Sequence, residues 1–172
     1  GYGFLTDILL VNNPKQILLI EKDSQLVIFL KEKYRNNNKI KILNIDVFKV
    51  DFSKFKNVKI ISNLPYNIST KIILYLFNFN KNISEMVFMI QKEVALKFDY
   101  NLTNMNKYKF LTKIVSTFSR CFDVSPKVFI PKPKVYSSVV KFKFNKNKFD
   151  LNKANDFSNL IFKNVRKKIY NN

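Results

Sequence analysis

Length and composition indicate one folded domain and exclude several kinds of chemistry. The chain has 172 residues, and its 47% hydrophobic and 15% aromatic content favours a globular domain over a disordered segment. It has no histidine and one cysteine, which excludes an internal disulfide, a zinc site and histidine-based acid–base catalysis. A lone cysteine fits a reducing cytoplasm. No apolar run reaches the roughly 18 residues that a membrane helix needs.

The charge balance favours a polyanionic partner. There are 31 lysines and arginines against 12 acidic residues, which gives a net charge of +19. Nucleic acid suits such a chain, because neutralising phosphates releases condensed counterions. An alternative source of the lysines is a genome rich in A and T, since Lys, Asn, Ile and Phe abound while arginine occurs only at Arg35, Arg120 and Arg166. Charge therefore supports nucleic-acid binding without establishing it.

Apolar runs and amphipathic segments alternate through the first part of the chain. Short apolar runs typical of parallel strands occupy residues 16–20, 39–45, 58–62 and 86–90. Segments with helical spacing of apolar residues lie between or after them, at residues 24–34, 70–79 and 91–98. The alternation predicts an α/β fold with a mainly parallel sheet.

The last part of the chain is predicted to contain two helices and one strand. A helix is expected from about residue 108 to residue 120, followed by a proline-bearing loop at residues 125–134. Residues 135–144 alternate loosely, which favours an antiparallel edge strand. Residues 153–170 are expected to form a final helix with a basic end.

Four residues are expected together at one edge of the sheet. Gly1 and Gly3 are typical of the turn after a first strand, where the absence of a Cβ lets the backbone approach a nucleotide-like ligand. Glu21, about twenty residues further on, ends an apolar strand and is placed to accept hydrogen bonds from ribose hydroxyls. Asp46 follows the next strand and can accept a hydrogen bond from the amine of an adenine. A surface glutamate at position 21 and a helix cap at position 46 are the alternatives.

The segment Asn63-Leu64-Pro65-Tyr66 carries the candidate catalytic residues. The lone pair of a nucleobase amine is delocalised into the ring, so this amine is a poor nucleophile. The Asn63 side-chain oxygen and the Leu64 carbonyl can accept both N–H bonds, and Pro65 fixes the backbone that presents this carbonyl. Tyr66 offers a flat face on which an extruded base can stack. The alternative is a proline turn that is capped by a serine or threonine before the next helix.

Five segments in this order resemble the ribosomal RNA adenine dimethyltransferase family. Members of that family dimethylate two adjacent adenosines near the 3′ end of small-subunit rRNA. The resemblance covers nearly the whole chain. Its segments are residues 1–6 (GYGFLT), 19–23 (LIEKD), 63–70 (NLPYNIST), 86–95 (MVFMIQKEVA) and 129–138 (FIPKPKVYSS).

The resemblance implies S-adenosylmethionine as the cofactor and gives roles to the residues at its site. Gly1 and Gly3 would form the end of the first cofactor motif. Glu21 would bind the ribose of the cofactor and Asp46 its adenine. Asn63 would face both the cofactor and the target amine.

The resemblance also implies contacts with the target RNA. Phe129 would be a second aromatic clamp on the flipped adenine, opposite Tyr66, with a role as a core anchor as the alternative. Phosphate contacts would come from basic side chains that could equally be solvated surface charges. These are Lys132, Lys134, Arg166, Lys167 and Lys168.

The resemblance is incomplete in places. We expect residues 1–148 to form a Rossmann-like methyltransferase domain that lacks its first strand and the acidic half of the cofactor motif. Residues 149–172 are expected to start a small C-terminal helical RNA-binding domain. The family's Tyr-Gly-x-Leu-Ser stretch is YKFLT at residues 108–112, so Lys109 replaces its glycine.

The sequence thus predicts an S-adenosylmethionine-dependent rRNA adenine-N6 dimethyltransferase with a role in ribosome biogenesis. Its expected partner is small-subunit rRNA in a pre-30S particle. We expect a monomer in the bacterial cytoplasm or an organellar matrix, without a metal or a membrane. The alternatives are a 23S rRNA methyltransferase of the macrolide-resistance type, a non-catalytic assembly or transcription factor with this fold, and a DNA adenine methyltransferase. Leu64 and residues 91–93 favour the small-subunit enzyme.

Overall fold

The computed structural model describes residues 1–145 and 151–162, and the chain forms two compact units. The first unit is Gly1–Asp51, and the second begins at Phe52. None of the helices in the described residues is both long and apolar enough to cross a membrane.

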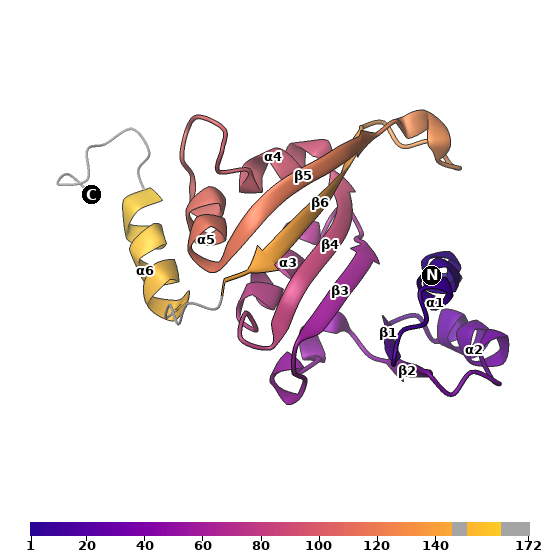
Figure 1. Ribbon diagram of the computed structural model, residues 1–172. Helices are drawn as coiled ribbons and strands as arrows, with labels where there is room; N and C mark the ends of the chain where they lie inside the picture. The colour runs from indigo at the N-terminus through magenta and orange to yellow at the C-terminus, as the bar shows by residue number, and fades with distance from the viewer. Residues whose placement is uncertain (146–150, 163–172) are drawn as a thin grey trace. The chain divides into compact units, whose positions relative to one another are not determined.

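The first unit contains two parallel strands and two helices (Figure 1). Helix α1 (Phe4–Val11) precedes β1 (Ile17–Glu21), and α2 (Ser24–Lys33) connects β1 to β2 (Ile40–Asn44). The two strands pair in parallel from Ile17 opposite Ile40 to Glu21 opposite Asn44. A short 3-10 helix, η1 (Val47–Lys49), follows β2. The parallel pairing brings the carboxyl ends of β1 and β2 to the same edge.

The second unit is built on a four-stranded sheet in the order β3-β4-β6-β5 (Figure 1). Its strands are β3 (Val58–Asn63), β4 (Ile83–Gln91), β5 (Ser116–Val124) and β6 (Ser137–Phe144). Strands β3 and β4 are parallel, and β6 is antiparallel to both β4 and β5. Strands β3, β4 and β5 therefore run in one direction and β6 alone runs in the other. The α/β class with a mainly parallel sheet is confirmed.

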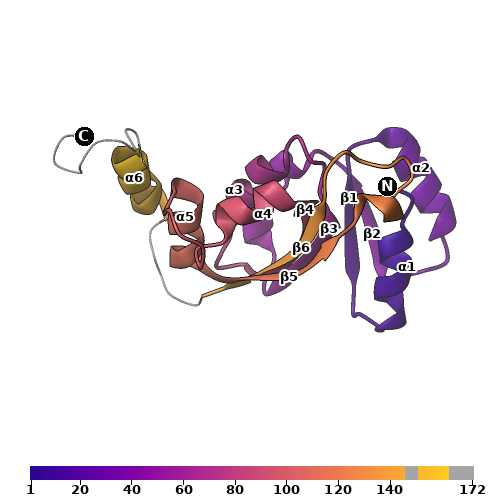
Figure 2. The same cartoon turned by 90° about the horizontal axis from the view of Figure 1, so that it is seen from above.

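Helices cover one face of this sheet. In Figure 2, α3 (Ser69–Phe77) and α4 (Lys92–Phe98) lie on the same side of the strands. The phenylalanine rings of this face pack edge to face: the Phe77 ring lies 5.7 Å from Phe142, and Phe98 also lies 5.7 Å from Phe142. The side chains of Phe88 and Phe142 are fully buried. Burial of these large apolar side chains supplies most of the driving force for folding of this unit.

Two further helices follow α4 in the chain. Helix α5 (Lys107–Val115) contacts α6 (Leu151–Phe162) through the rings of Phe110 and Phe157, whose centres are 5.8 Å apart. The Nζ of Lys107 donates a hydrogen bond to Asn159 Oδ1 at 2.6 Å. The expected final helix at residues 153–170 is confirmed up to Phe162, and its basic end lies outside the described residues.

The expected helix at residues 108–120 is wrong in its second half. Helix α5 ends at Val115, and residues 116–124 form strand β5. Residues such as Ser116 and Thr117 have low helix propensity, and pairing with β6 determines their conformation. Phe118 is buried against Phe142, at 5.0 Å between ring centres, and this contact stabilises the extended conformation of residues 116–124.

The expected position of the last strand is also corrected. Strand β6 is antiparallel, as expected, but it lies between β4 and β5 and is not an edge strand. The edge position belongs to β5, the strand that the sequence pattern did not indicate. Val140 and Phe142 are fully buried in β6, as a central strand requires. A further helix that the pattern did not indicate, α1, follows Gly3.

Candidate active site

The carboxyl ends of β1 and β2 bring three of the predicted cofactor residues together. The amino group of Gly1 donates a hydrogen bond to the Glu21 carboxylate, and the other Glu21 oxygen accepts from the Asp23 backbone N–H at 3.0 Å. Asp46 comes two residues after the end of β2 and is the N-cap of η1. Lys22 joins the two ends, because its Nζ lies 3.0 Å from Asp46 Oδ2. The expectation that Gly1, Glu21 and Asp46 share one edge is consistent with this geometry.

The charge of Glu21 reflects opposing effects. Partial burial alone raises the pKa of this carboxyl, but the hydrogen bonds from the Gly1 amino group and the Asp23 backbone lower it, and the net pKa is below its ordinary value. The backbone of Glu21 is also fixed, since the Asn44 side chain donates to the Glu21 carbonyl at 3.2 Å. The carboxylate is therefore ionised near neutral pH, as an acceptor for hydroxyl groups must be.

Asp46 acts locally as the cap of η1. Its Oδ1 accepts from the Phe48 backbone N–H at 3.1 Å, so the capping alternative of the sequence analysis applies to one of its two oxygens. The pKa of Asp46 is lowered, first by the Phe48 hydrogen bond and then by Lys22. A carboxylate has about four lone-pair positions, so these contacts leave capacity for a ligand.

Gly3 stands at the start of α1 in a conformation that favours glycine. Its φ is +81°, in the left-handed region. A Cβ at this position would lie 2.4 Å from the Tyr34 hydroxyl oxygen. Tyr34 is itself buried and lies within hydrogen-bonding distance of the Gly3 carbonyl (2.9 Å) and Asp7 Oδ1 (2.7 Å). Glycine at position 3 is required by both the backbone and the space around it.

The predicted catalytic segment lies at the carboxyl end of β3 in the second unit. Asn63 is the last residue of β3, and its side chain is exposed. Leu64 is buried, and its N–H donates to the Met89 carbonyl at 3.1 Å, which extends the pairing with β4 by one residue. Pro65 begins a turn that is closed by a hydrogen bond from the Ile68 N–H to the Pro65 carbonyl at 3.3 Å.

Two polar groups of this segment, the Asn63 side chain and the Leu64 carbonyl, have no hydrogen-bond partner among the described residues. Among the described residues, none forms a hydrogen bond with the Asn63 side chain or donates one to the Leu64 carbonyl. The turn is not a simple helix cap. The residue at the cap of α3 is Ile68, and the Ser69 hydroxyl instead donates back to the Tyr66 carbonyl at 3.1 Å. These groups are thus free to accept hydrogen bonds from a ligand.

Tyr66 is fixed at its far end. Its hydroxyl lies 2.6 Å from the Ser137 hydroxyl, and the ring is half-buried. Ser137 is the first residue of β6 and is fully buried. Ser137 lies in the family-like segment at residues 129–138, but its role was not predicted, because a contact across 71 residues leaves no local pattern.

A second group of polar contacts lies beside Ser137 and was also missed. Lys92 Nζ lies 2.7 Å from Asp123 Oδ2, and the Ser138 hydroxyl donates to Asp123 Oδ1 at 2.6 Å. The pKa of Asp123 is lowered, first by the hydrogen bond from Lys92 and then by the one from Ser138. The Lys92 N–H donates to the Tyr136 carbonyl at 2.9 Å. These contacts connect the ends of β4 and β5 to the start of β6.

The loop between β5 and β6 carries the predicted RNA contacts. Because β5 runs parallel to β4, this loop leaves the sheet at the same edge as Asn63 (Figure 1). Phe129 is half-buried, and its ring does not contact Tyr66 in the described structure. Lys132 and Lys134 are exposed. The clamp and the phosphate contacts remain predictions, and Arg166, Lys167 and Lys168 lie outside the described residues.

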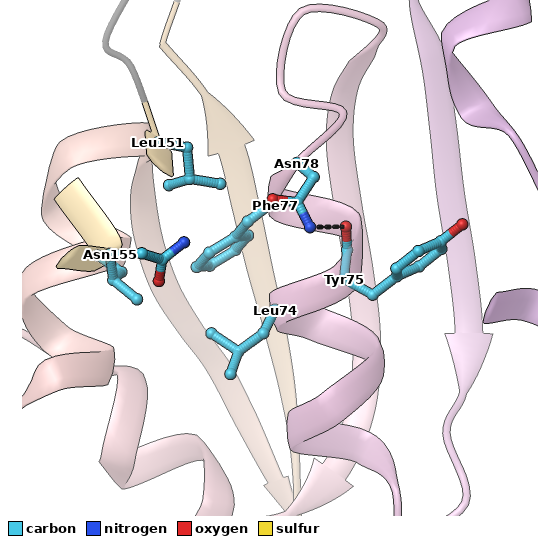
Figure 3. Close-up of a pocket in the computed structure, with 7 residues that line it drawn as sticks. Leu74, Tyr75, Phe77, Asn78, Leu151 and Asn155 are labelled. Carbon is cyan, nitrogen blue, oxygen red and sulfur yellow. Dashed lines mark hydrogen bonds between the residues drawn. The ribbon is translucent and has the colours of Figure 1, made fainter. Parts of the chain in front are cut away.

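A hollow of the second unit lies away from the Asn63 segment. It has a volume of about 210 Å³ and lies between α3, α5 and α6 (Figure 3). Its wall includes Tyr75 and Asn78 at the end of α3, where the Asn78 side chain donates to the Tyr75 carbonyl at 3.1 Å. Since α3 starts beside Asn63 and runs away from it, this hollow is at the opposite end of the helix. We do not assign it to the candidate site.

Lys109, which replaces a glycine of the family pattern, has a structural role. It is buried, and its Nζ donates to the carbonyls of Thr103 and Asn104 at 2.8 Å and 3.2 Å, with a longer contact of 3.4 Å to Leu102. These carbonyls belong to the loop before α5. The ammonium group thus donates hydrogen bonds to loop carbonyls that would otherwise need water as a donor.

Comparison with known proteins identifies the class of fold. A crystal structure of a dimethyladenosine transferase from Plasmodium falciparum superposes with a TM-score of 0.85 at 25% identity, covering 100% of this chain and 65% of that one. A crystal structure of the 23S rRNA methyltransferase ErmE has a TM-score of 0.82 at 21% identity, covering 98% of this chain and 70% of that one. The fold is that of an S-adenosylmethionine-dependent methyltransferase.

The sequence comparisons identify the family. The family model described as ribosomal RNA adenine dimethylase matches residues 1–172. A ribosomal RNA small subunit methyltransferase A from Malacoplasma penetrans is 40% identical over 180 aligned residues, which cover 100% of this chain and 64% of that relative. The chain belongs to the ribosomal RNA adenine dimethylase family. It spans less than two thirds of the length of this relative.

Proposed function

We propose that the protein transfers methyl groups from S-adenosylmethionine to N6 of adjacent adenosines near the 3′ end of small-subunit rRNA. The observation that carries the proposal is the Asn63 side chain, which is exposed at the end of β3 without a hydrogen bond to any described residue. Beside it are a free Leu64 carbonyl and the anchored ring of Tyr66. Relatives named ribosomal RNA small subunit methyltransferase A support this choice of substrate.

The residues of the segment supply positioning. The Asn63 oxygen and the Leu64 carbonyl accept the two N–H bonds of the target amine, which moves the nitrogen toward tetrahedral geometry and frees its lone pair. Tyr66 stacks on the extruded base and keeps it in this orientation. The cofactor, when bound, supplies an activated methyl group on a positive sulfonium. The methylated nitrogen would release its extra proton to water, so no side chain has to titrate near neutral pH.

The first unit has hydrogen-bond acceptors that fit the cofactor. Glu21 and Asp46 are both ionised, they follow neighbouring parallel strands, and each can accept hydrogen bonds from hydroxyl or amine groups. In the proposal, Glu21 binds the ribose and Asp46 the adenine, while Gly1 and Gly3 provide backbone close to the ligand. Asn63 is proposed to face both the cofactor and the target amine.

We also propose an RNA partner and a cellular location for the protein. The substrate is rRNA in a pre-30S particle, contacted by the loop with Lys132 and Lys134 and by Arg166, Lys167 and Lys168. Helix α6 is proposed to begin the C-terminal RNA-binding domain. The expected location is the bacterial cytoplasm or an organellar matrix.

Substitution of Asn63 tests the proposed activity. Asn63→Ala removes one of two acceptors for the target amine, and we expect methyl transfer from labelled cofactor to 30S subunits to fall by about 100-fold or more, as for loss of a comparable positioned dipole. Asn67→Ala is the matched control, because Asn67 is also exposed and lies in the same turn. Undiminished transfer by Asn63→Ala, with a normal thermal unfolding midpoint, would contradict the proposal.

Mapping of the product separates the alternatives. Primer extension is expected to stop at adjacent adenosines near the 3′ end of 16S-type rRNA after incubation with the protein. Stops on 23S rRNA would show the macrolide-resistance type of activity instead. Calorimetry that detects no binding of S-adenosylmethionine would favour a non-catalytic assembly factor.

A further inference from the structure

The hydroxyl of Tyr66 connects two parts of the sheet that are not neighbours. Tyr66 follows β3, Ser137 begins β6, and β4 lies between these strands. The hydrogen bond between the two hydroxyl oxygens, at 2.6 Å, therefore holds the tyrosine side chain across the end of β4. A tyrosine ring attached only through its Cβ can rotate about two bonds, and this contact removes that freedom.

Ser137 is well placed to act as a fixed anchor. It is fully buried and pairs with Gln91 of β4 on one side and Val124 of β5 on the other. The residues next to it in sequence are also held. The Tyr136 carbonyl accepts from the Lys92 N–H, and the Ser138 hydroxyl donates to Asp123.

The ion pair between Lys92 and Asp123 completes this support. Lys92 starts α4 directly after β4, and Asp123 is near the end of β5. Their contact at 2.7 Å joins the strands on both sides of β6. The backbone at the start of β6 is therefore held from both β4 and β5, and it carries the Ser137 hydroxyl that contacts Tyr66.

We propose that Ser137 is a positioning residue for base stacking: its hydroxyl orients the ring of Tyr66, and the Lys92–Asp123–Ser138 contacts hold Ser137 in place. This inference rests on the proposed function, since it assumes that Tyr66 stacks on the target base. An oriented ring matters because transfer to the base nitrogen requires a narrow range of geometries, and positioning contributes to the rate of such reactions.

A double-mutant cycle tests this coupling. Tyr66→Phe keeps the ring and removes only its hydroxyl, and Ser137→Ala removes the partner. We expect each substitution to lower kcat for methyl transfer to 30S subunits by about 2- to 10-fold, the range for one neutral hydrogen bond. The double variant should be no slower than the slower single variant, because both remove the same contact. KM for the cofactor should be unchanged.

Controls separate positioning from stability. Ser119→Ala removes an exposed serine from β5 and is expected to leave kcat unchanged. If Ser137→Ala fails to fold, as shown by its thermal unfolding midpoint, Tyr66→Phe alone still reports the contact through its loss of kcat at unchanged cofactor KM.

Two results would overturn the inference. One is a further drop in kcat when Ser137→Ala is added to Tyr66→Phe, which would show that Ser137 acts independently of the tyrosine hydroxyl. The other is wild-type kcat for Tyr66→Phe. Either result can occur while Asn63→Ala shows its expected loss of transfer, so failure of this inference is distinguishable from failure of the proposed function.

Discussion

At the scale of single residues, Gly3 shows how one position can be restricted by both conformation and space. Gly3→Ala places a side chain at a φ of +81° and sets its Cβ 2.4 Å from the Tyr34 hydroxyl oxygen. We expect the free energy of unfolding to fall by about 1–3 kcal/mol, because the backbone is strained and Tyr34 must move. Urea unfolding followed by circular dichroism measures this change.

Gly1→Ala is the control for this prediction, because no atom lies within 4 Å of a Cβ built at Gly1. Equal stability losses in the two variants would show that the space around Gly3 is not the cause.

At the same scale, the sequence was most informative where chemistry is local. The pattern placed Asn63 to Tyr66 at the end of a strand, and the structure has Asn63 as the last residue of β3. The partner of Tyr66 could not be predicted from a local pattern. Ser137 lies 71 residues away and comes within hydrogen-bonding distance of Tyr66 only when β6 pairs with β4.

At the scale of elements, Asp7 connects the two helices of the first unit. It lies in α1, and its carboxylate contacts Lys33 (2.6 Å) and Tyr34 (2.7 Å) at the end of α2. Its pKa is lowered below the ordinary 3.8, first by the hydrogen bond from Lys33 and then by that from Tyr34. A carboxyl with a depressed pKa stabilises the folded state above its unfolded pKa and loses this effect as the pH falls through the folded value.

Asp7→Asn is therefore expected to lower the thermal unfolding midpoint at neutral pH. The difference from the unsubstituted protein should shrink below about pH 3.8 and close below the folded pKa, since the carboxyl is then protonated in both states. Thermal unfolding measured from about pH 7 to about pH 2 checks this. Glu32→Gln, in the exposed pair with Arg35, is the control. A difference that stays constant with pH would contradict the assignment.

The elements also show where pattern reading fails. Strands β3 and β4 were predicted because short apolar runs carry their own signal. Strand β5 was not, because most of its side chains are exposed and Phe118 is its one large buried residue. Its extended form is determined by pairing with β6, which is an interaction outside the segment itself.

At the scale of the whole molecule, the net charge of +19 predicts strong dependence of RNA binding on salt. Affinity should fall linearly on a logarithmic plot against salt concentration. The double substitution Lys132→Ala/Lys134→Ala should reduce this slope by about 1–2, because each phosphate contact contributes about 0.7–0.9. Fluorescence anisotropy with an rRNA fragment at several KCl concentrations measures it.

The matched control removes the same charge at the opposite ends of the strands, where β3 and β4 begin. Lys56→Ala/Lys81→Ala changes two exposed lysines near the starts of β3 and β4. An equal change of slope in both double variants would show that total charge, and not the β5–β6 loop, determines binding. That outcome would favour the alternative that the lysines come from a genome rich in A and T.

The sequence by itself determined the α/β class, the family and the position of the Asn63–Tyr66 segment, because these depend on local apolar patterns and short motifs. Tertiary structure alone decided that β6 is central, that Lys109 caps backbone carbonyls, and that Ser137 anchors Tyr66. The physical reason is that these features depend on partners far apart in the chain, which come together only when hydrophobic burial fixes the register of the sheet.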